Sequence, residues 1–379
     1  MKLHLPFIIF LLAGVGFCAE SLPSAEESRK RAGKLAKEGN WKESLELNRK
    51  LLADIDDDRS WKDLENALQA LRNLRQPGLA DELIEGAVRD HAGISSVLRK
   101  AAQSYHNLQH SGSLLDGEFQ RGFNRGGGAY VSCEGRDRVR SIQLILQAIE
   151  KEDPDDAGSL SDMYSELAMY LSSGRTGSRR VWALGVLTGL DELPDFGSEQ
   201  RLSSGSGAPV DRDGELLLIQ VPETWDAARN DGERWRWAIS KSVGLDPGKG
   251  PGAADQWARF LVQHYGVATL SGFGWWRQQD PDDAKGIMQV HTLKESETIA
   301  RLAAGVKRLE LPVDYQFIPL LRRLSTGKGS NAALGDLLVQ VFLDRRQLVS
   351  ASKELKRLIK THGRGEASQR QKLLGQIEG

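Results

Sequence analysis

Residues 119–138, FQRGFNRGGGAYVSCEGRDR, contain the residue types of a ligand-binding loop, with three consecutive glycines beside arginines and aromatic side chains. A phosphate-binding loop requires a lysine and a serine or threonine directly after its last glycine. Here Gly128 is followed by Ala129 and Tyr130, so the stretch is not a phosphate-binding loop. It also lacks the third glycine of the dinucleotide-binding fingerprint. A single Arg-Gly-Gly is also no RNA-binding array. We therefore expect a glycine-rich loop between two helices, with Arg125 and Tyr130 available to contact a partner.

The histidines include one pair at metal-ligand spacing. His106 and His110 stand four residues apart, so they would share one face of a helix. Zinc needs three or four converging ligands, but HNLQH lacks the metalloprotease glutamate and no third ligand is suitably spaced. The acidic run DPDDAKG at 280–286 lacks the spacing and closing glutamate of a calcium loop. We predict no metal and no cofactor.

Side chains for catalysis form no recognisable set. The sequence shows no serine nucleophile elbow, no paired serine and lysine, and no carboxylate dyad. We therefore predict that the chain is not an enzyme, and we rank a zinc enzyme built on His106 and His110 third among the hypotheses.

Tryptophan is frequent, with nine residues in the chain. RWRW at 234–237 and Trp257 stand in segments of helical spacing, where large aromatic side chains usually belong to the core. Trp275 and Trp276 lie in a loop that begins with glycines, so we expect at least one exposed indole ring there. This pair is the best candidate for a contact surface.

Length and charge set wide limits on function. A chain of 379 residues has room for two or three domains. Charged residues make up 27%, the net charge is −1, and the two signs are interspersed. This balance shows no electrostatic footprint for nucleic acid or for a membrane surface, so we predict no nucleic-acid partner.

The N-terminus has the pattern of a secretory signal peptide. Lys2 precedes the apolar run LPFIIFLLAGVGF, which is too short for a comfortable membrane span. We predict a signal peptide within residues 1–19, with cleavage after Cys18, and hence a periplasmic or extracellular location. The exported chain would then hold one thiol, Cys133, and no internal disulfide. Association with a membrane is expected only if Cys18 is lipidated or the N-terminus stays uncleaved.

Helical periodicity dominates the region 20–197. In residues 25–55 small and apolar residues recur on both sides of Gly39-Asn40, with Ala32 and Ser44 among them, which predicts two amphipathic helices joined by a tight turn. The spacing resembles a tetratricopeptide repeat without its closing proline. A second helix pair is expected in SWKDLENALQALRNL and GLADELIEGAVRDH. Further helices are expected in SSVLRKAAQSYHNL, DRVRSIQLILQAIEK and SLSDMYSELAMYLSS.

The rest of the chain divides into a mixed middle segment, 198–290, and a C-terminal helical-repeat region, 291–379. In the middle, LLLIQV at 216–221 is a candidate strand, and ETWDAARNDGERWRWAISKSV and AADQWARFLVQHYGV return to helical spacing. Thr292 and Glu295 stand at capping-box spacing, which predicts a helix start. Residues 333–363 again predict a helical hairpin, with Ala351 at the small position. We expect a mainly α fold in which the hairpins stack into a solenoid around a loop-rich middle with little β structure.

Four long stretches resemble one family: GEFQRGFNRGGGAYVSCEGRDRVRSIQL, GAPVDRDGELLLIQVPETWDAARNDGERWRWAI, FLVQHYGVATL and HTLKESETIARLAAGVKRLELPVDYQFI. Together they are similar to the N-terminal helical region of large bacterial alpha-2-macroglobulin family proteins, over most of the chain from about residue 30. The resemblance implies a tetratricopeptide-like region ahead of macroglobulin β-sandwich domains. It also implies a role in trapping or inhibiting peptidases outside the cytoplasm.

The chain departs from that family in two ways. Cys133 begins CEGR, so the glutamine of the family's Cys-Gly-Glu-Gln thioester motif is missing. The 379 residues also include no run of sandwich strands, so we expect a truncated chain or a stand-alone helical module.

Two functions follow as hypotheses. The first is a non-enzymatic, exported helical-repeat region that binds another protein or other domains of its own full-length chain. The contacts are expected at Trp275, Trp276, Arg125 and Tyr130. The alternative is an extracytoplasmic carbohydrate- or envelope-binding module that uses the tryptophan-rich centre.

Overall fold

A computed structural model gives the fold of the chain. It describes residues 24–53, 58–123, 128–173, 181–197, 207–268, 290–302, 305–326, 330–362 and 367–379. The chain divides into two compact units, Met1–Gln76 and Pro77–Gly379. The predicted signal peptide therefore lies outside the described residues, and the segment boundaries predicted at 197 and 290 stay predictions.

The described part of the first unit contains three helices: α1 (Ala25–Lys37), α2 (Trp41–Leu52) and α3 (Ser60–Asn73). Helix α1 starts with a capping box, in which Ser24 and Glu27 satisfy each other's backbone amides. The small residues predicted at the contact of α1 and α2 are both buried, and the Ser44 hydroxyl donates to the Ala32 carbonyl at 3.0 Å. The predicted helix pair is confirmed.

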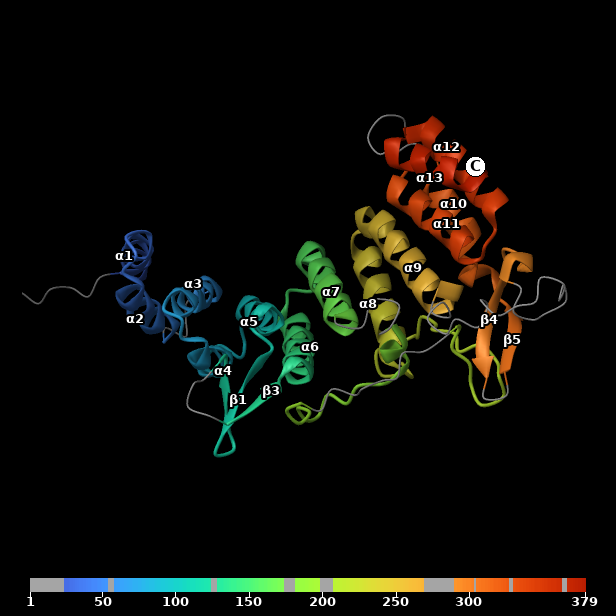
Figure 1. The fold of residues 1–379 in the computed structure, drawn as a ribbon. Coiled ribbons are helices and arrows are strands. Elements are labelled where there is room, and N and C mark those ends of the chain that lie inside the picture. Colours follow the sequence, from blue (N-terminus) through green and yellow to red (C-terminus); the bar gives the residue numbers. More distant parts are fainter. Residues whose placement is uncertain are drawn as a thin grey trace, which may run out of the picture. The chain divides into compact units, whose positions relative to one another are not determined.

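The second unit begins with helices around a small sheet (Figure 1). Its first elements are η1 (Pro77–Leu79), α4 (Ala80–Asp90), α5 (Ser95–Asn107), β1 (Ser111–Leu115), β2 (Glu118–Arg121), β3 (Ala129–Ser132), α6 (Glu134–Lys151) and α7 (Ala157–Ser172). The sheet is antiparallel with the order β2-β1-β3. Helix α5 packs on α6, and α6 packs on α7.

This sheet corrects the expectation of a glycine-rich loop between helices over residues 119–138. Asp116 and Gly117 have φ values of 49° and 86°, and Leu115 pairs with Glu118. A two-residue turn with positive φ at both positions is the connection that fits the twist of a β-hairpin. Residues of β2 and β3 within this stretch are therefore strand. The turn that pairs β2 with β1 is formed by Asp116 and Gly117, just before the stretch begins.

The middle of the chain contains η2 (Val181–Gly185), α8 (Asp231–Leu245), η3 (Pro247–Lys249) and α9 (Gly250–Tyr265). Asn230 caps α8 by accepting from the Glu233 amide at 2.9 Å, so the helix expected from residue 223 begins at Asp231. The strand expected at 216–221 is wrong. Leu216 forms only an isolated bridge with Val210, and the carbonyls of Leu217 and Ile219 accept from Tyr265 and Tyr315 side chains instead.

A hairpin and four helices follow: η6 (Val290–Thr292), β4 (Glu297–Leu302), β5 (Gly305–Glu310), η7 (Val313–Tyr315), α10 (Phe317–Leu324), α11 (Ala332–Asp344), α12 (Leu348–His362) and α13 (Ala367–Glu378). Strands β4 and β5 pair antiparallel. The helical hairpin predicted at 333–363 is confirmed as α11 and α12, with Ala351 fully buried.

The helix start predicted from Thr292 and Glu295 is wrong, because tertiary contacts hold this segment as a strand. The Glu295 carboxylate pairs with Arg322 at 2.7 Å, so it does not cap a helix. The Thr298 hydroxyl bonds the Tyr265 carbonyl, and Arg345 donates to the carbonyls of Lys294 and Glu297. These partners outweigh the local helical spacing.

The described chain is mainly α-helical with little sheet, as the sequence predicts. Among the described residues, no helix combines the length and apolar character needed to cross a membrane.

Helices α11 and α12 approach closely at Gly335. A Cβ built there would lie 2.3 Å from Cδ2 of Leu358, which is itself fully buried. Gly335→Ala is therefore expected to lower the free energy of unfolding of this hairpin by about 1–3 kcal/mol, as overpacking does.

Gly375 on α13 is the matched control, because a Cβ there meets nothing within 4 Å. Gly375→Ala is expected to raise helix stability by about 0.5–1 kcal/mol. Hydrogen exchange of the α11 and α12 amides measures the first effect, and exchange of the α13 amides measures the second. Equal effects of the two substitutions would contradict the close approach.

Candidate functional site

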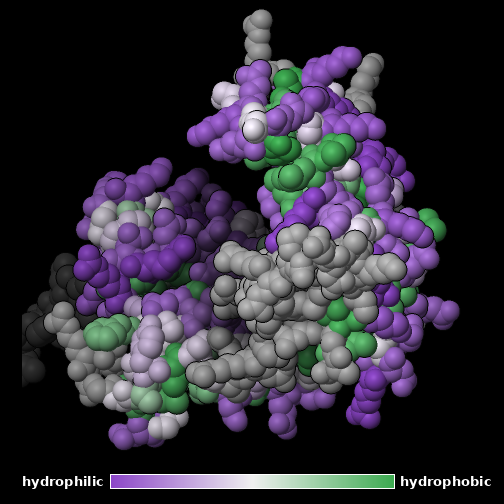
Figure 2. Space-filling view, turned by 45° about the vertical axis from the view of Figure 1, so that its right-hand side comes forward, coloured by the Kyte–Doolittle hydropathy of each residue, from purple (hydrophilic) through white to green (hydrophobic). Residues whose placement is uncertain are grey.

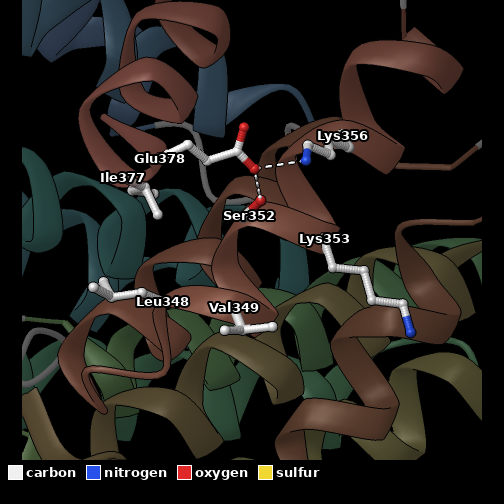
Figure 3. Close-up of a pocket in the computed structure, with 7 residues that line it drawn as sticks. All are labelled: Leu348, Val349, Ser352, Lys353, Lys356, Ile377 and Glu378. Carbon is white, nitrogen blue, oxygen red and sulfur yellow. Dashed lines mark hydrogen bonds and ion pairs between the residues drawn. The ribbon is translucent and has the colours of Figure 1, made fainter.

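An open groove lies between the first half of α12 and the end of α13, and it encloses about 470 Å³. Its lining residues are Leu348, Val349, Ser352, Lys353, Lys356, Ile377 and Glu378. Figure 3 shows the Glu378 carboxylate between Ser352 and Lys356, with Lys353 directed away from them. The Glu378 contact to Lys356 Nζ is 2.6 Å, and the contact to Ser352 Oγ is 2.5 Å. These bonds hold α13 against α12 at this end of the groove.

The groove has an apolar edge that the rest of the fold leaves open. Val349 is 86% exposed and Leu348 is 49% exposed. Large apolar side chains at such exposure mark an interaction surface when they gather with a groove and a polar rim. The arrangement suits binding of another molecule.

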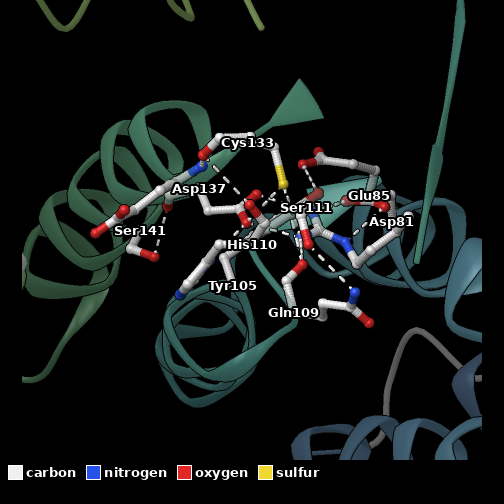
Figure 4. A network of polar contacts seen from close by, with 12 residues as sticks. Asp81, Glu85, Tyr105, Gln109, His110, Ser111, Cys133, Asp137 and Ser141 are labelled. Atoms are coloured by element: carbon white, nitrogen blue, oxygen red, sulfur yellow. Dashed lines mark hydrogen bonds and ion pairs between the residues drawn. The ribbon is translucent and has the colours of Figure 1, made fainter. Parts of the chain in front are cut away.

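A network of buried charges is the second candidate site (Figure 4). The Arg121 guanidinium on β2 is 2% exposed and reaches Asp137 on α6 at 2.7 Å and Asp81 on α4 at 2.6 Å. Its Nη1 also donates to the Gln109 carbonyl at 2.6 Å. One side chain thus joins the sheet to helices before and after it.

His110 and Cys133 complete this network. His110 Nδ1 lies 2.8 Å from Asp137 Oδ2, and the Cys133 thiol lies 3.3 Å from the same oxygen. Burial and the charge of Asp137 raise the pKa of Cys133 to about 12, so the thiol stays protonated near neutral pH. A protonated, buried thiol is a poor nucleophile, and the network therefore suits a structural role.

Asp137 stays ionised despite its burial. Burial alone would raise its pKa, but hydrogen bonds from Arg121 and His110 outweigh it and lower the pKa below the usual value. The hydrogen bond to Asp137 raises the pKa of His110, although partial burial opposes that shift. The three side chains are a mutually neutralising set.

The predicted contact residues fall in different places. Tyr130 lies on β3, is 59% exposed, and shares a 2.6 Å hydrogen bond with the Ser111 hydroxyl. Arg125, Trp275 and Trp276 lie outside the described residues. Of the four predicted contact residues, only Tyr130 lies in the described part of the structure, where its exposure suits a contact surface.

Tryptophans at helical spacing belong to packed aromatic clusters. Trp235 and Trp257 contact Phe260 with ring centroids 5.1 and 5.3 Å apart. Trp225 and Trp237 meet edge to face at 5.7 Å. Trp235 is 4% exposed, so its assignment to the core is confirmed.

The shared helix face expected for His106 and His110 is wrong. Helix α5 ends at Asn107, and Leu108 continues in an extended conformation, so His110 lies beyond the helix beside Asp137. His106 instead packs on the Tyr170 ring at 5.0 Å. Within the described residues, no group of three or more candidate ligands could hold a metal ion.

Sequence reasoning missed both the Arg121 network and the groove. Asp81, Arg121 and Asp137 are charged residues in a chain with 27% charged residues, and nothing local singles them out. The groove had a weak signal, since Leu348-Val349 is an apolar pair at the start of a lysine-rich helix.

Comparisons with known proteins add little. No protein-family model and no curated protein matches the chain. Among solved structures, it is similar to a chain described as Assembly Chaperone of RpL4 (Acl4), residues 1–338, with a TM-score of 0.32 and 13% identity. The match covers 94% of this chain and 98% of that chain.

Removing the central cation should destabilise the second unit. Arg121→Met leaves Asp137 buried without its main partner, so we expect a loss of about 3–5 kcal/mol. The matched control is Arg89→Met, whose side chain is 75% exposed beside Asp90, with an expected change within about 0.5 kcal/mol. Native-state hydrogen exchange of the α6 amides measures both, and a loss below about 1 kcal/mol for Arg121→Met would show that the network is dispensable.

The pairing of His110 with Asp137 should make stability depend on pH. Because the folded pKa of His110 is raised, its contribution is complete below about pH 6.5 and disappears as pH rises through the folded pKa. His106 nearby has a lowered pKa, mainly from burial, and acts in the opposite direction. Comparing the wild type with His110→Gln therefore isolates the contribution of His110 to the pH dependence of stability.

The difference in melting temperature between these two chains should be largest near pH 6 and shrink toward pH 8.5. His291→Gln, at an exposed histidine, is the control and should follow the wild-type profile. A wild-type advantage over His110→Gln that grows with rising pH would contradict the assignment.

Proposed function

We propose that this chain is a non-enzymatic helical-repeat region that acts by binding protein. One observation carries the proposal. In each unit, the principal helix–helix contacts join helices that follow each other in the sequence, from α1 to α3 and from α4 to α13. Packing dominated by sequence neighbours is typical of a solenoid, and solenoids present long surfaces that recognise other proteins.

The charged side chains of the described core support a binding role more than a catalytic one. Arg121 and Asp137 pair with each other, Arg29 pairs with buried Asp63, and Glu354 on α12 pairs with Arg322 on α10. Each is used to join elements of the fold. A catalytic group needs a proton or an electron pair that is available to substrate.

We also propose that this region belongs to an exported protein of the alpha-2-macroglobulin family. The proposal rests on the four sequence stretches given above and on the apolar run after Lys2. Reading the gene beyond the Gly379 codon tests it. A frame that continues into macroglobulin β-sandwich domains supports the family, and a chain recovered from the cytoplasm with its N-terminus intact would overturn export.

The carbohydrate- or envelope-binding alternative depends on Trp275 and Trp276, which lie outside the described residues. Quenching of tryptophan fluorescence by glycan fragments would support it. An unchanged spectrum across a glycan panel would eliminate it.

Photo-crosslinking of the full chain in the cells that produce it tests the protein-binding role. A photoreactive residue is placed in turn at four exposed positions: Tyr130, Met169, Val313 and Val349. We expect adducts with a defined protein from at least one position, and saturable binding of that purified protein by calorimetry. The proposal fails if no crosslinked protein binds saturably when purified.

A further inference from the structure

Helix α12 presents a single exposed stripe beside the groove. Val349, Lys353, Lys356 and Lys360 are all exposed and follow one another at spacings of four, three and four residues. Such spacing places them on one face of a helix. From Val349 to Lys360 the stripe is about 16 Å long at 1.5 Å per residue, which is about three helical turns.

The sequence around the groove carries an excess of positive charge. Residues 341–379 contain nine lysines and arginines and four aspartates and glutamates, which gives +5 in a chain whose net charge is −1. Lys356 is paired with Glu378, whereas Lys353 extends away from that pair (Figure 3). Two of the nine, Arg345 and Arg370, are buried, so the positive charge beside the groove comes from the exposed Lys353, Lys356 and Lys360.

The start of α12 adds to this positive character. Its first turn contains no acidic residue, and the Gln347 side-chain amide before it donates to the carbonyls of Leu293 and His291. The first backbone amides of a helix carry partial positive charge and need acceptors. These amides belong to Leu348 and Val349, which also supply the apolar edge.

We propose that the groove between α12 and α13 binds an acidic, amphipathic helical segment of another protein. Apolar side chains of that segment would cover Leu348, Val349 and Ile377. Its carboxylates would meet Lys353, Lys360 and the start of α12. Figure 2 shows a hydrophobic patch bounded by hydrophilic side chains on the uppermost part of the molecule, where α12 and α13 lie in Figure 1. The assignment rests on the proposed protein-binding function and adds the site and the chemistry of the partner.

A peptide is chosen over other polyanions because the groove has an exposed apolar edge that the ligand must cover. Nucleic acid and anionic membrane surfaces would satisfy the lysines, but a nucleic-acid backbone would leave the 86% exposed Val349 uncovered. A helix laid in a groove covers apolar residues and places charges along both rims.

The test uses fluorescence anisotropy with the full chain and three labelled peptides of about 18 residues, long enough to span the stripe. One has leucines at helical spacing flanked by glutamates. In the second the glutamates are lysines, and in the third the leucines are serines. A single-stranded DNA of 20 nucleotides and vesicles of phosphatidylglycerol are the competing probes. We expect the first peptide to bind at least about tenfold more tightly than the other two.

Matched variants locate the binding. Val349→Ser should weaken the first peptide about three- to tenfold, whereas Val313→Ser, at a valine 82% exposed elsewhere, should not. Lys353→Glu with Lys360→Glu should weaken the acidic peptide about tenfold and strengthen the basic one, whereas Lys42→Glu on α2 should change neither.

Three results would overturn the proposal: no binding of the first peptide, equal binding of the peptide without leucines, or binding of DNA or vesicles alone. Equal loss in Val349→Ser and Val313→Ser would place the contact elsewhere and would also refute it. None of these results bears on the crosslinking experiment, because a protein partner crosslinked at Tyr130 or Met169 would still support the wider binding role.

Discussion

Within each unit, the described helices pack mainly on helices that precede or follow them in the sequence. This constraint explains why small residues recur at the contacts, as at Ala32 and Ala351, which are almost fully buried. A short side chain lets two neighbouring helix backbones approach, so that the larger residues around it can interdigitate. In a solenoid, packing of this kind makes each hairpin depend on the next one for a complete core.

Two buried arginines supply the longer-range connections that neighbour packing lacks. Arg121 joins β2 to α4 and α6, and Arg345 joins the turn after α11 to the backbone at Lys294 and Glu297. Both sheets are small, and a small sheet beside helices exposes backbone and side-chain acceptors that need donors. A guanidinium is suited to this task, because its five donors reach several acceptors at once and it stays charged.

The sequence predicted helices more reliably than the sheets and the site, for physical reasons. Helical spacing is local, so α11 and α12 could be recognised from residues 333–363 alone. Strand β4 could not, because what holds Thr298 in a strand is the Tyr265 carbonyl and the side chain of Arg345. The pairing of Asp81, Arg121 and Asp137 depends on three elements meeting in space. The position predicted for His110 was wrong because α5 ends at Asn107, three residues before it. The groove was missed because the exposed face of α12 is defined only once α11 and α13 cover the other faces.

The distribution of charge separates the interior of this fold from its surface. Inside, cations and carboxylates are matched locally, as Arg121 is with Asp81 and Asp137, so the interior contributes little to the external field. On α12, by contrast, Lys353, Lys356 and Lys360 place positive charge in water. At physiological salt it acts over about 8 Å, so it would speed and orient an encounter more than it would hold a complex. Affinity must then come from covering Leu348 and Val349, which is why charge and apolar surface have to be engaged by the same ligand.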